Sequence, residues 1–304
     1  MQKIRLLSQK IKKLEIQGAS AVARSIVLAL RNYAAGIEAK DKKGFVRQFN
    51  KGIDVLLSVR PTEPLSFNLV KYVSLELKKA KDATGCVFIV KRAVNNALKL
   101  LEESKKKISR HGMDLVKNND HIFTHCHSSN VEDILIKAKK SGKKFIVFNT
   151  ETRPLLQGHI TAKNLLKAGI NVTMVTDASA GFFISRFSDR GMMMDKLIIG
   201  CDAILLDGSC VNKIGSFVTA LAARNEKEKV YIAGSLLKFH SKNWIKIEKR
   251  PAKEIWSGAP KNLKMINLAF DIIPAEYIDG IICEAGIIKP SQIARKAREI
   301  YPWL

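Results

Sequence analysis

Hydrophobic residues recur at two different spacings along this chain, and the change between them divides it into two parts. Up to about residue 115 they recur every three or four positions, as over residues 21–34 and 70–77, which is the period of an amphipathic helix. From His121 onward, short apolar runs each precede a helical stretch: HIFTHC, KKFIVFN, NVTMVT, DAILLD and KVYIAG. We therefore predict an all-helical domain over residues 1–115 and a Rossmann-like α/β domain over residues 116–304.

The apolar runs of the second part are continuous rather than alternating, which is typical of strands buried on both faces of a mainly parallel sheet. The fold class expected is therefore α/β. Ligands of such sheets bind beyond the carboxyl ends of the strands. We expect functional residues directly after the runs, in the segments 126–130, 151–158, 177–181, 207–213 and 234–238.

Composition narrows the class of protein. The longest apolar runs are strand-length, far short of the ~20 residues that cross a bilayer, and the charged N-terminus lacks the apolar core of a secretory signal. The five cysteines stand singly, without the spacing of a zinc site. The stretch Asp207-Gly208-Ser209 lacks the glycine spacing of a nucleotide loop. We expect a cytoplasmic protein with reduced thiols and with no metal or organic cofactor.

The formal charge of +24 raises the question of nucleic-acid binding. Residues 1–110 carry 24 of the 52 Lys and Arg residues but only 9 of the 28 Asp and Glu residues, so the excess lies mainly in the helical part. These lysines have helix-face spacing without aromatic residues between them, and no nucleic-acid-binding signature is present. A solvated basic surface is therefore favoured over a nucleic-acid site.

Cys126 is the first candidate for chemistry, in the stretch THCHSSN at the end of a strand. If the following serines open a helix, its unpaired N–H groups attract anions and favour a thiolate, which can act as nucleophile or base. The alternative is a small buried residue at a strand end. Along a strand, His125 and His127 point away from Cys126, which argues against a metal site.

Asp202 enters an apolar run in the stretch GCDAILLDGSCVNKIGS, and a buried carboxyl holds its proton more readily, as a general acid must. The alternative is an aspartate that caps a turn. Asn212 and Lys213 follow at the expected start of a helix, where a cation and backbone N–H groups converge on an oxyanion, although a solvated lysine also fits. In ETRPLLQGHIT, Arg153 is either a phosphate ligand or a surface residue.

Taken together, these segments resemble the family that holds ribose-1,5-bisphosphate isomerases, 5-methylthioribose-1-phosphate isomerases and the regulatory subunits of translation initiation factor 2B. The matches are IQGASAVAR (16–24), VRPTEPLSFN (59–68), THCHSS (124–129), ETRPLLQG (151–158), GCDAILLDGSCVNKIGS (200–216), KVYIAGSLLKF (229–239) and PAEYIDGIICEAGII (274–288). The resemblance implies a helical domain followed by a Rossmann-like domain.

The resemblance also implies a reaction, because the family's isomerases carry the Cys and the Asp found here at Cys126 and Asp202, whereas the regulatory subunits typically lack them. Cys126 is then the proton acceptor and Asp202 the proton donor in converting ribose 1,5-bisphosphate to ribulose 1,5-bisphosphate. The H-C-H-S-S pattern resembles this enzyme more than the methylthioribose-1-phosphate isomerase, which usually has asparagine at His127. That enzyme and an initiation-factor-type regulatory or binding subunit are the alternatives.

The implied ligands of the sugar bisphosphate are Gln17, Gly18, Ala19, Ser20, Arg60, Ser128, Arg153, Gln157, Asn212, Lys213 and Lys238. Gln17 departs from the family's pattern, in which an arginine is usual, and therefore removes one expected phosphate cation. The segment 185–194 is a few residues longer than is usual in the family. Residues 271–274 read D-I-I-P, where the family more usually has D-x-T-P. Homo-oligomers, either dimers or hexamers, are implied by the resemblance alone.

Overall fold

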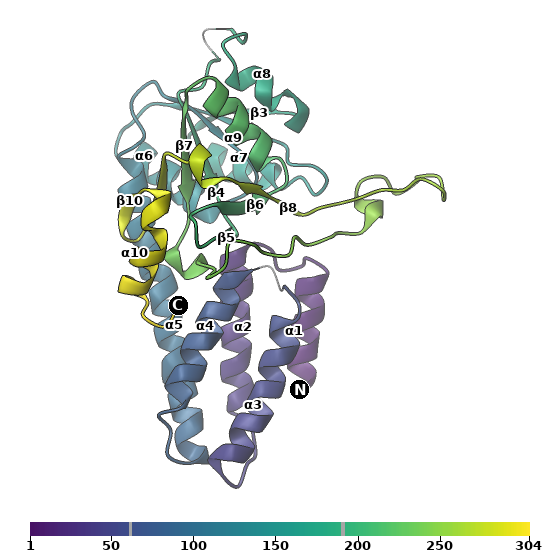
Figure 1. Ribbon diagram of the computed structural model, residues 1–304, viewed down its shortest axis with the longest axis vertical. Coiled ribbons are helices and arrows are strands. Elements are labelled where there is room, and N and C mark those ends of the chain that lie inside the picture. The colour runs from purple at the N-terminus through teal and green to yellow at the C-terminus, as the bar shows by residue number, and fades with distance from the viewer. Residues whose placement is uncertain (61–62, 190–191) are drawn as a thin grey trace. The chain divides into compact units, whose positions relative to one another are not determined.

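The structure, a computed structural model, describes residues 1–60, 63–189 and 192–304, in two compact units that are each described by themselves (Figure 1). The first consists of Met1–Glu103 with Tyr301–Leu304, and the second of Ser104–Ile300. The predicted boundary at residue 115 follows the end of the helical pattern, whereas the structural division falls within one long helix. Pro61 and Thr62 of the 59–68 motif, and Arg190 and Gly191 of the 185–194 segment, lie outside the described residues.

Amphipathic helices build the first unit, as predicted. Its helices are α1 (Gln2–Lys12), α2 (Ala19–Ala34), α3 (Lys42–Leu57), α4 (Pro64–Leu77) and α5 (Ala83–Met113), of which the last continues into the second unit. In α2 the buried positions recur every three or four residues and include Val22, Ile26 and Leu30. At the start of α3, the Asp41 carboxylate accepts a hydrogen bond from the Gly44 amide at 2.6 Å.

The second unit is built on a seven-stranded sheet in the order β10-β9-β7-β4-β1-β2-β3, in which only β10 runs antiparallel to its neighbour. This confirms the predicted α/β class with a mainly parallel sheet. The central strands are buried on both faces, as the continuous apolar runs predict. The strands are β1 (His121–Thr124), β2 (Ile146–Thr150), β3 (Asn171–Val175), β4 (Lys196–Gly200), β7 (Lys229–Ala233), β9 (Gly280–Cys283) and β10 (Gly286–Ile288).

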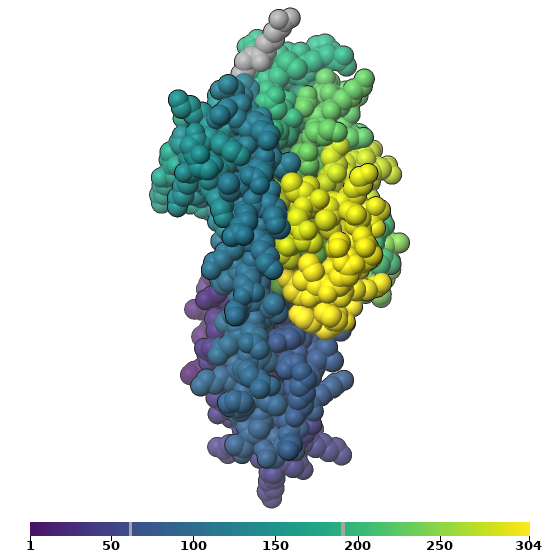
Figure 2. All heavy atoms as spheres, turned by 90° about the vertical axis from the view of Figure 1, so that its left-hand side faces the viewer, coloured from purple at the N-terminus to yellow at the C-terminus, as the bar shows by residue number. Residues whose placement is uncertain are grey.

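Helices cover both faces of this sheet (Figure 1). They are α6 (Ser129–Lys140), α7 (Gly158–Lys167), α8 (Ala180–Ile184), α9 (Ser216–Asn225) and α10 (Ile293–Ile300). Helices α6 and α7 pack together, as do α8 and α9, and right-handed crossovers put the two pairs on opposite faces because the strand order reverses between β1 and β4. In Figure 2 the atoms of the C-terminal segment, in yellow, lie beside those of the end of α5, in blue, and His111 Nδ1 lies 3.0 Å from the carbonyl oxygen of Cys283.

One predicted strand is wrong. The sequence predicts that residues 202–207 form a strand of the parallel sheet, but the preceding run, β4, takes that place. The run 202–207 contributes only β5 (Ala203–Ile204), which belongs to a small antiparallel sheet with β6 (Cys210–Lys213) and β8 (Phe270–Ile273). Both runs are apolar and adjacent, so their hydrophobicity does not tell which of them joins the main sheet. The chain turns at Gly200, and Asp202 therefore follows a strand of the main sheet.

No helix in residues 1–60, 63–189 or 192–304 combines the length and the apolar character needed to cross a membrane.

Candidate active site

The two predicted catalytic side chains follow the two strands at which the order of the sheet reverses. From the centre outward, β1, β2 and β3 lie to one side, and β4, β7 and β9 to the other. Cys126 comes two residues after β1, and Asp202 two residues after β4. In open α/β sheets, ligands bind at this switch point, beyond the carboxyl ends of the strands. The topology thus brings both side chains to the position where a ligand is expected.

Cys126 has a left-handed backbone conformation, with φ of 70°, which is uncommon for a residue other than glycine. Two threonine hydroxyls hold it in place. The Cys126 amide donates to Thr152 Oγ1 at 3.1 Å, and Thr161 Oγ1 donates to the Cys126 carbonyl oxygen at 3.1 Å. Such a conformation costs of order 1 to 3 kcal/mol and persists only where its surroundings enforce it.

The Cys126 thiol is protonated at neutral pH, which corrects the expectation of a stabilised thiolate. Burial raises the pKa of this thiol to about 12, because the thiolate would lose its hydration. The positive charge of Lys213 and the His127 amide lower the pKa, the negative charge of Asp202 raises it, and burial outweighs them all. The start of α6 therefore does not hold this side chain as a thiolate at neutral pH.

This protonation state has a measurable consequence. We expect iodoacetamide to alkylate Cys126 slowly up to about pH 9 and progressively faster above it, because only the thiolate attacks. All five cysteines lie in the described part of the chain as buried free thiols, so peptide mass spectrometry is needed to separate them. The modified peptide should be missing in Cys126→Ser. A rate that already levels off near neutral pH would contradict the raised pKa.

Asp202 is half-buried rather than buried, because it lies in a turn and not inside an apolar strand. Its amide donates to the carbonyl oxygen of Val211 at 2.7 Å, next to the pairing of β5 with β6. The turn packs closely on the loop of Cys126, since a Cβ on Gly200 would come within 2.5 Å of Ser128 Oγ. Ser128 is the half-buried residue that precedes α6, as predicted from the sequence.

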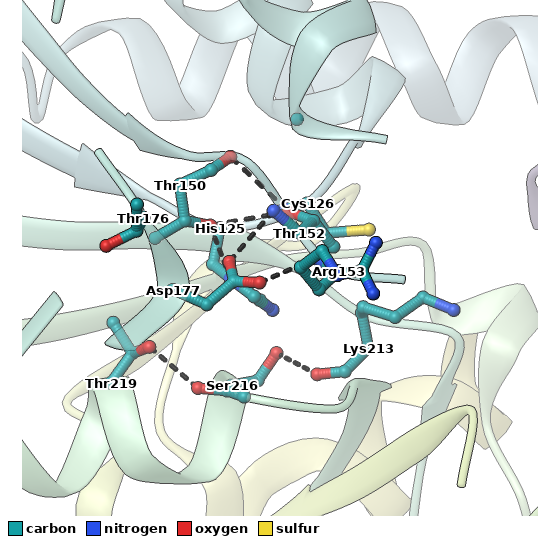
Figure 3. Close-up of polar contacts among 12 residues, drawn as sticks. His125, Cys126, Thr150, Thr152, Arg153, Thr176, Asp177, Lys213, Ser216 and Thr219 are labelled. Carbon is teal, nitrogen blue, oxygen red and sulfur yellow. Dashed lines mark hydrogen bonds and ion pairs between the residues drawn. The ribbon is translucent and has the colours of Figure 1, made fainter. Parts of the chain in front are cut away.

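Lys213 and Asn212 lie at the end of β6, and α9 begins only at Ser216. Lys213 Nζ lies 5.0 Å from the centre of the ring of Phe270, its neighbour in β8, in a cation–π contact. Figure 3 shows its side chain pointing to the same side as the sulfur of Cys126. Asn212 is buried, and its Nδ2 donates to Ser216 Oγ at 2.8 Å, so it supports the turn that carries Lys213.

Lys238 is buried, and its ammonium donates to the carbonyl oxygen of Cys201, the residue before Asp202. A hydrogen bond with Cys210 and the charge of Lys238 lower the pKa of the Cys201 thiol. One of the three ammonium hydrogens therefore holds the turn that carries Asp202.

The loop after β2 carries Arg153 and Gln157 and is fixed by Asp177. The Asp177 carboxylate accepts hydrogen bonds from the amides of Thr152 at 2.8 Å and Arg153 at 2.5 Å. Arg153 is exposed, and its Nη2 donates to the carbonyl oxygen of Ile255 at 2.9 Å. Gln157 Oε1 is buried and has no hydrogen-bond partner among the described residues, so it suits a substrate hydroxyl better than a phosphate.

The remaining predicted ligands belong to the helical unit. Gly18, with φ of 80°, directly precedes α2, so the amides of the first turn have no partner within the helix. Gln17 is exposed, Ser20 is half-buried and Ala19 is buried. Arg60 is half-buried and follows α3. The structure thus gathers Cys126, Ser128, Arg153, Gln157, Asp202, Asn212, Lys213 and Lys238 in the second unit, and Gln17, Gly18, Ala19, Ser20 and Arg60 in the first.

The two histidines beside Cys126 bond to separate partners. His127 Nδ1 lies 2.9 Å from Glu132 Oε1, whereas His125 contacts Thr150 Oγ1 and the carbonyl oxygen of Ile214. Within the described parts of the chain, no group of three or more His, Cys, Asp or Glu side chains is arranged to hold a metal ion.

Five residues that shape this candidate site are not among the ligands or catalytic residues predicted from the sequence: His125, Thr150, Thr152, Asp177 and Phe270. A signal was present for Thr152 and Asp177, since both fall in segments expected directly after strands. Their roles follow from contacts between segments far apart in the chain, which spacing does not show.

We expect the free energy of unfolding to depend on pH because of Asp271, which lies at the base of this site. Its carboxylate accepts hydrogen bonds from the Gly215 and Phe217 amides at 2.7 and 3.1 Å, but burial outweighs them and raises its pKa to about 6. Because the folded protein holds this proton more tightly than the unfolded chain, stability is lost as the pH rises from about 4 to 6, by about 2 kcal/mol.

The expected result is therefore that the wild type loses about 2 kcal/mol of unfolding free energy relative to Asp271→Asn between pH 4 and pH 7. Urea unfolding of both proteins at the two pH values measures it. An unchanged difference between the two proteins would show that Asp271 does not titrate as described.

The fold and the site define a class first: an α/β protein with a helical unit ahead of a Rossmann-like sheet, and with a thiol, a carboxylate and a cation at its switch point. The chain belongs to the Initiation factor 2 subunit family, whose sequence profile matches residues 15–290. This confirms the predicted family.

Particular relatives agree with this assignment. The chain is 34% identical to the ribose 1,5-bisphosphate isomerase of Methanocaldococcus jannaschii, over 97% of this chain and 94% of that protein. It is 31% identical to the methylthioribose-1-phosphate isomerase of Geotalea daltonii, over 93% and 86%. Among solved structures, the translation initiation factor eIF-2B of Pyrococcus horikoshii OT3 matches with a TM-score of 0.83 at 27% identity, over 96% of this chain and 98% of that one.

Proposed function

We propose that this protein is an isomerase that converts ribose 1,5-bisphosphate to ribulose 1,5-bisphosphate. The observation that carries the proposal is the placement of Cys126 and Asp202 after the two strands that flank the switch point of the sheet. Near-full-length similarity to a ribose 1,5-bisphosphate isomerase supports the same reaction.

The substrate explains why the site needs both an acid and a base. The anomeric oxygen of ribose 1,5-bisphosphate carries a phosphate, so the ring does not open spontaneously to a free aldehyde. In the proposed reaction, Asp202 protonates the ring oxygen as the bond between C1 and that oxygen breaks, and the Cys126 thiolate removes the C2 proton as the double bond between C1 and C2 forms, which gives a phosphoenolate-like intermediate. The Cys126 thiol then returns the proton at C1, and the C2 hydroxyl gives its proton to the Asp202 carboxylate to leave the 2-ketone.

The raised pKa of Cys126 can be reconciled with its role as base. The proposed base is the thiolate of Cys126, and the positive charge of Lys213 lowers the pKa of this thiol and so favours formation of the thiolate. A thiolate formed from a weakly acidic thiol is in turn a strong base for the C2 proton.

We assign one phosphate of the substrate to Lys213, supported by Lys238 and by the exposed Arg153. Lys213 is half-buried and its side chain points to the same side as the sulfur of Cys126 (Figure 3). A charged hydrogen bond to phosphate contributes about 1.5 to 3 kcal/mol. Ser128, Gln157 and Asn212 are proposed to bind or orient the sugar rather than the phosphate, since their polar atoms are uncharged.

A substitution at Gln17, where the family's pattern has an arginine, tests whether this residue of the helical unit binds the substrate. We expect Gln17→Arg to lower KM for ribose 1,5-bisphosphate about tenfold with kcat little changed, because it adds one charged contact to phosphate of about 1.5 kcal/mol. Steady-state kinetics measure it, and Gln9→Arg on α1 is the matched control for added charge. An unchanged KM would remove Gln17 from the proposed ligands.

We also propose that copies of this chain assemble into a dimer or a hexamer. Size-exclusion chromatography with light scattering tests this directly, and a monomer at all concentrations would refute it.

The proposed reaction is tested by incubating the purified protein with ribose 1,5-bisphosphate and following phosphorus NMR signals. Formation of ribulose 1,5-bisphosphate is the expected result. A parallel incubation with methylthioribose 1-phosphate tests the alternative supported by the 31% identical Geotalea relative. Conversion of neither compound, with binding of a sugar phosphate retained, would favour the regulatory or binding subunit.

A further inference from the structure

A chain of hydrogen bonds runs from the Cys126 amide to the carbonyl oxygen of Ile214, through side chains that the proposed chemistry does not use. Figure 3 shows Cys126, Thr152, Thr150 and His125. The Cys126 amide donates to Thr152 Oγ1 at 3.1 Å, and Thr152 Oγ1 lies 3.3 Å from Thr150 Oγ1. Thr150 Oγ1 lies 2.6 Å from His125 Nδ1, and His125 Nε2 lies 2.9 Å from the oxygen of Ile214. His125, Thr150 and Thr152 are all buried.

The donor and acceptor at each of these hydrogen bonds can be assigned. A carbonyl oxygen only accepts, so Nε2 of His125 carries a hydrogen. Burial lowers the pKa of His125, which keeps the ring neutral and makes Nδ1 an acceptor. Thr150 then donates to His125, so the Thr152 hydroxyl, whose oxygen accepts the Cys126 amide, is the donor to Thr150 Oγ1 at 3.3 Å. The carbonyl oxygen of Thr150, at 3.4 Å, is a second acceptor for the same hydroxyl.

These hydrogen bonds link three segments of the second unit. Cys126 lies in the loop after β1, Thr150 ends β2 with Thr152 two residues later, and Ile214 directly follows Lys213, the last residue of β6 in the small sheet. Asp177, after β3, fixes the far side through the Thr152 amide.

Gly215 makes room for the ring. A Cβ on Gly215 would come within 3.0 Å of His125 Cε1, and the φ of 101° at this position favours glycine. The imidazole therefore lies directly against the backbone that carries Lys213.

We infer that His125 is a positioning residue, which sets the left-handed backbone of Cys126 against the turn of Lys213 through Thr150 and Thr152. The inference rests on the proposed function, in which Cys126 and Lys213 act on one substrate. His125 touches neither the reacting atoms nor the phosphate in this assignment, and its two ring nitrogens serve two different ends of the site.

Two substitutions separate these ends. His125→Asn keeps an acceptor near the position of Nδ1, and so keeps the link through Thr150 to Cys126, but it loses the bond to Ile214. His125→Gln keeps a donor near the position of Nε2 and so keeps the bond to Ile214, but it loses the link to Cys126.

The expected kinetics differ accordingly. His125→Asn raises KM about tenfold with kcat within about twofold, because Lys213 is released, and His125→Gln lowers kcat about tenfold with KM within about twofold, because Cys126 is released. A residue needed only for folding would affect both variants in the same way, and that result overturns the inference.

A second measurement does not depend on turnover. Nitrogen NMR of the His125 ring at pH 7.5 should show the neutral form with hydrogen on Nε2. Thr152→Val should raise the rate of Cys126 alkylation at least fivefold, whereas Thr152→Ser, which retains the hydroxyl, should not. Hydrogen on Nδ1, or equal alkylation of the valine and serine variants, overturns the inference. If both results hold but no sugar phosphate is isomerised, the proposed function fails and the positioning remains.

Discussion

Cys126→Ser should lower kcat by about three orders of magnitude or more while the protein stays folded and still binds the substrate. Serine nearly preserves the volume of the buried side chain, and its backbone can adopt the same left-handed conformation. Its oxygen, however, loses a proton far less readily than a thiol, and a positioned base typically contributes 10² to 10⁴ in rate. Rapid-quench or steady-state assays with ribose 1,5-bisphosphate measure kcat, and the change in intrinsic fluorescence on ligand addition measures binding.

A matched control is available in the same unit. Cys283 is also buried, and its thiol donates to the carbonyl oxygen of Gly286 at 3.4 Å, a bond that a hydroxyl can keep. Cys283→Ser should retain kcat within about twofold. If Cys126→Ser kept more than a tenth of wild-type kcat, Cys126 would not be the base.

Asp202→Asn should lower kcat to a similar extent, because the amide has no acidic proton to give to the ring oxygen. KM should change little, since Asp202 is not among the proposed phosphate ligands. Asp207→Asn is the control, because Asp207 is exposed and lies on the same segment.

The double variant adds a sharper result. Cys126 and Asp202 are proposed to act as base and acid in the same ring-opening step, and residues that act as a unit lose activity non-additively. Cys126→Ser with Asp202→Asn should therefore be no slower than the worse single variant, within a factor of about three. Steady-state kinetics of all four proteins measure this. Losses that multiply would show that the two groups act independently.

The sequence predicts the fold class well because the period of the hydrophobic residues changes where helices give way to buried strands. It fails at residues 202–207, since two apolar runs stand next to each other and only the packed sheet shows that β4 is the buried strand. This error did not move Asp202 away from the site, because the turn after β4 carries it to the carboxyl edge in any case.

The residue types of the candidate site can be proposed from the sequence, whereas its electrostatics cannot. Strand ends and the family resemblance identify Cys126, Asp202 and Lys213. They do not reveal that burial raises the pKa of Cys126 to about 12, because desolvation depends on the packing of distant segments. They also do not reveal that Lys238 supports the turn of Asp202, or that His125 bridges two loops, since both depend on contacts over long sequence separations.

The most direct test of the central claim is carbon NMR of ribose 1,5-bisphosphate labelled at C2, incubated with the wild type, Cys126→Ser and Asp202→Asn. The account predicts that a ketone signal of ribulose 1,5-bisphosphate grows with the wild type and stays at background with both variants. A wild type that leaves the C2 signal unchanged, or variants that produce the ketone at the wild-type rate, would contradict it.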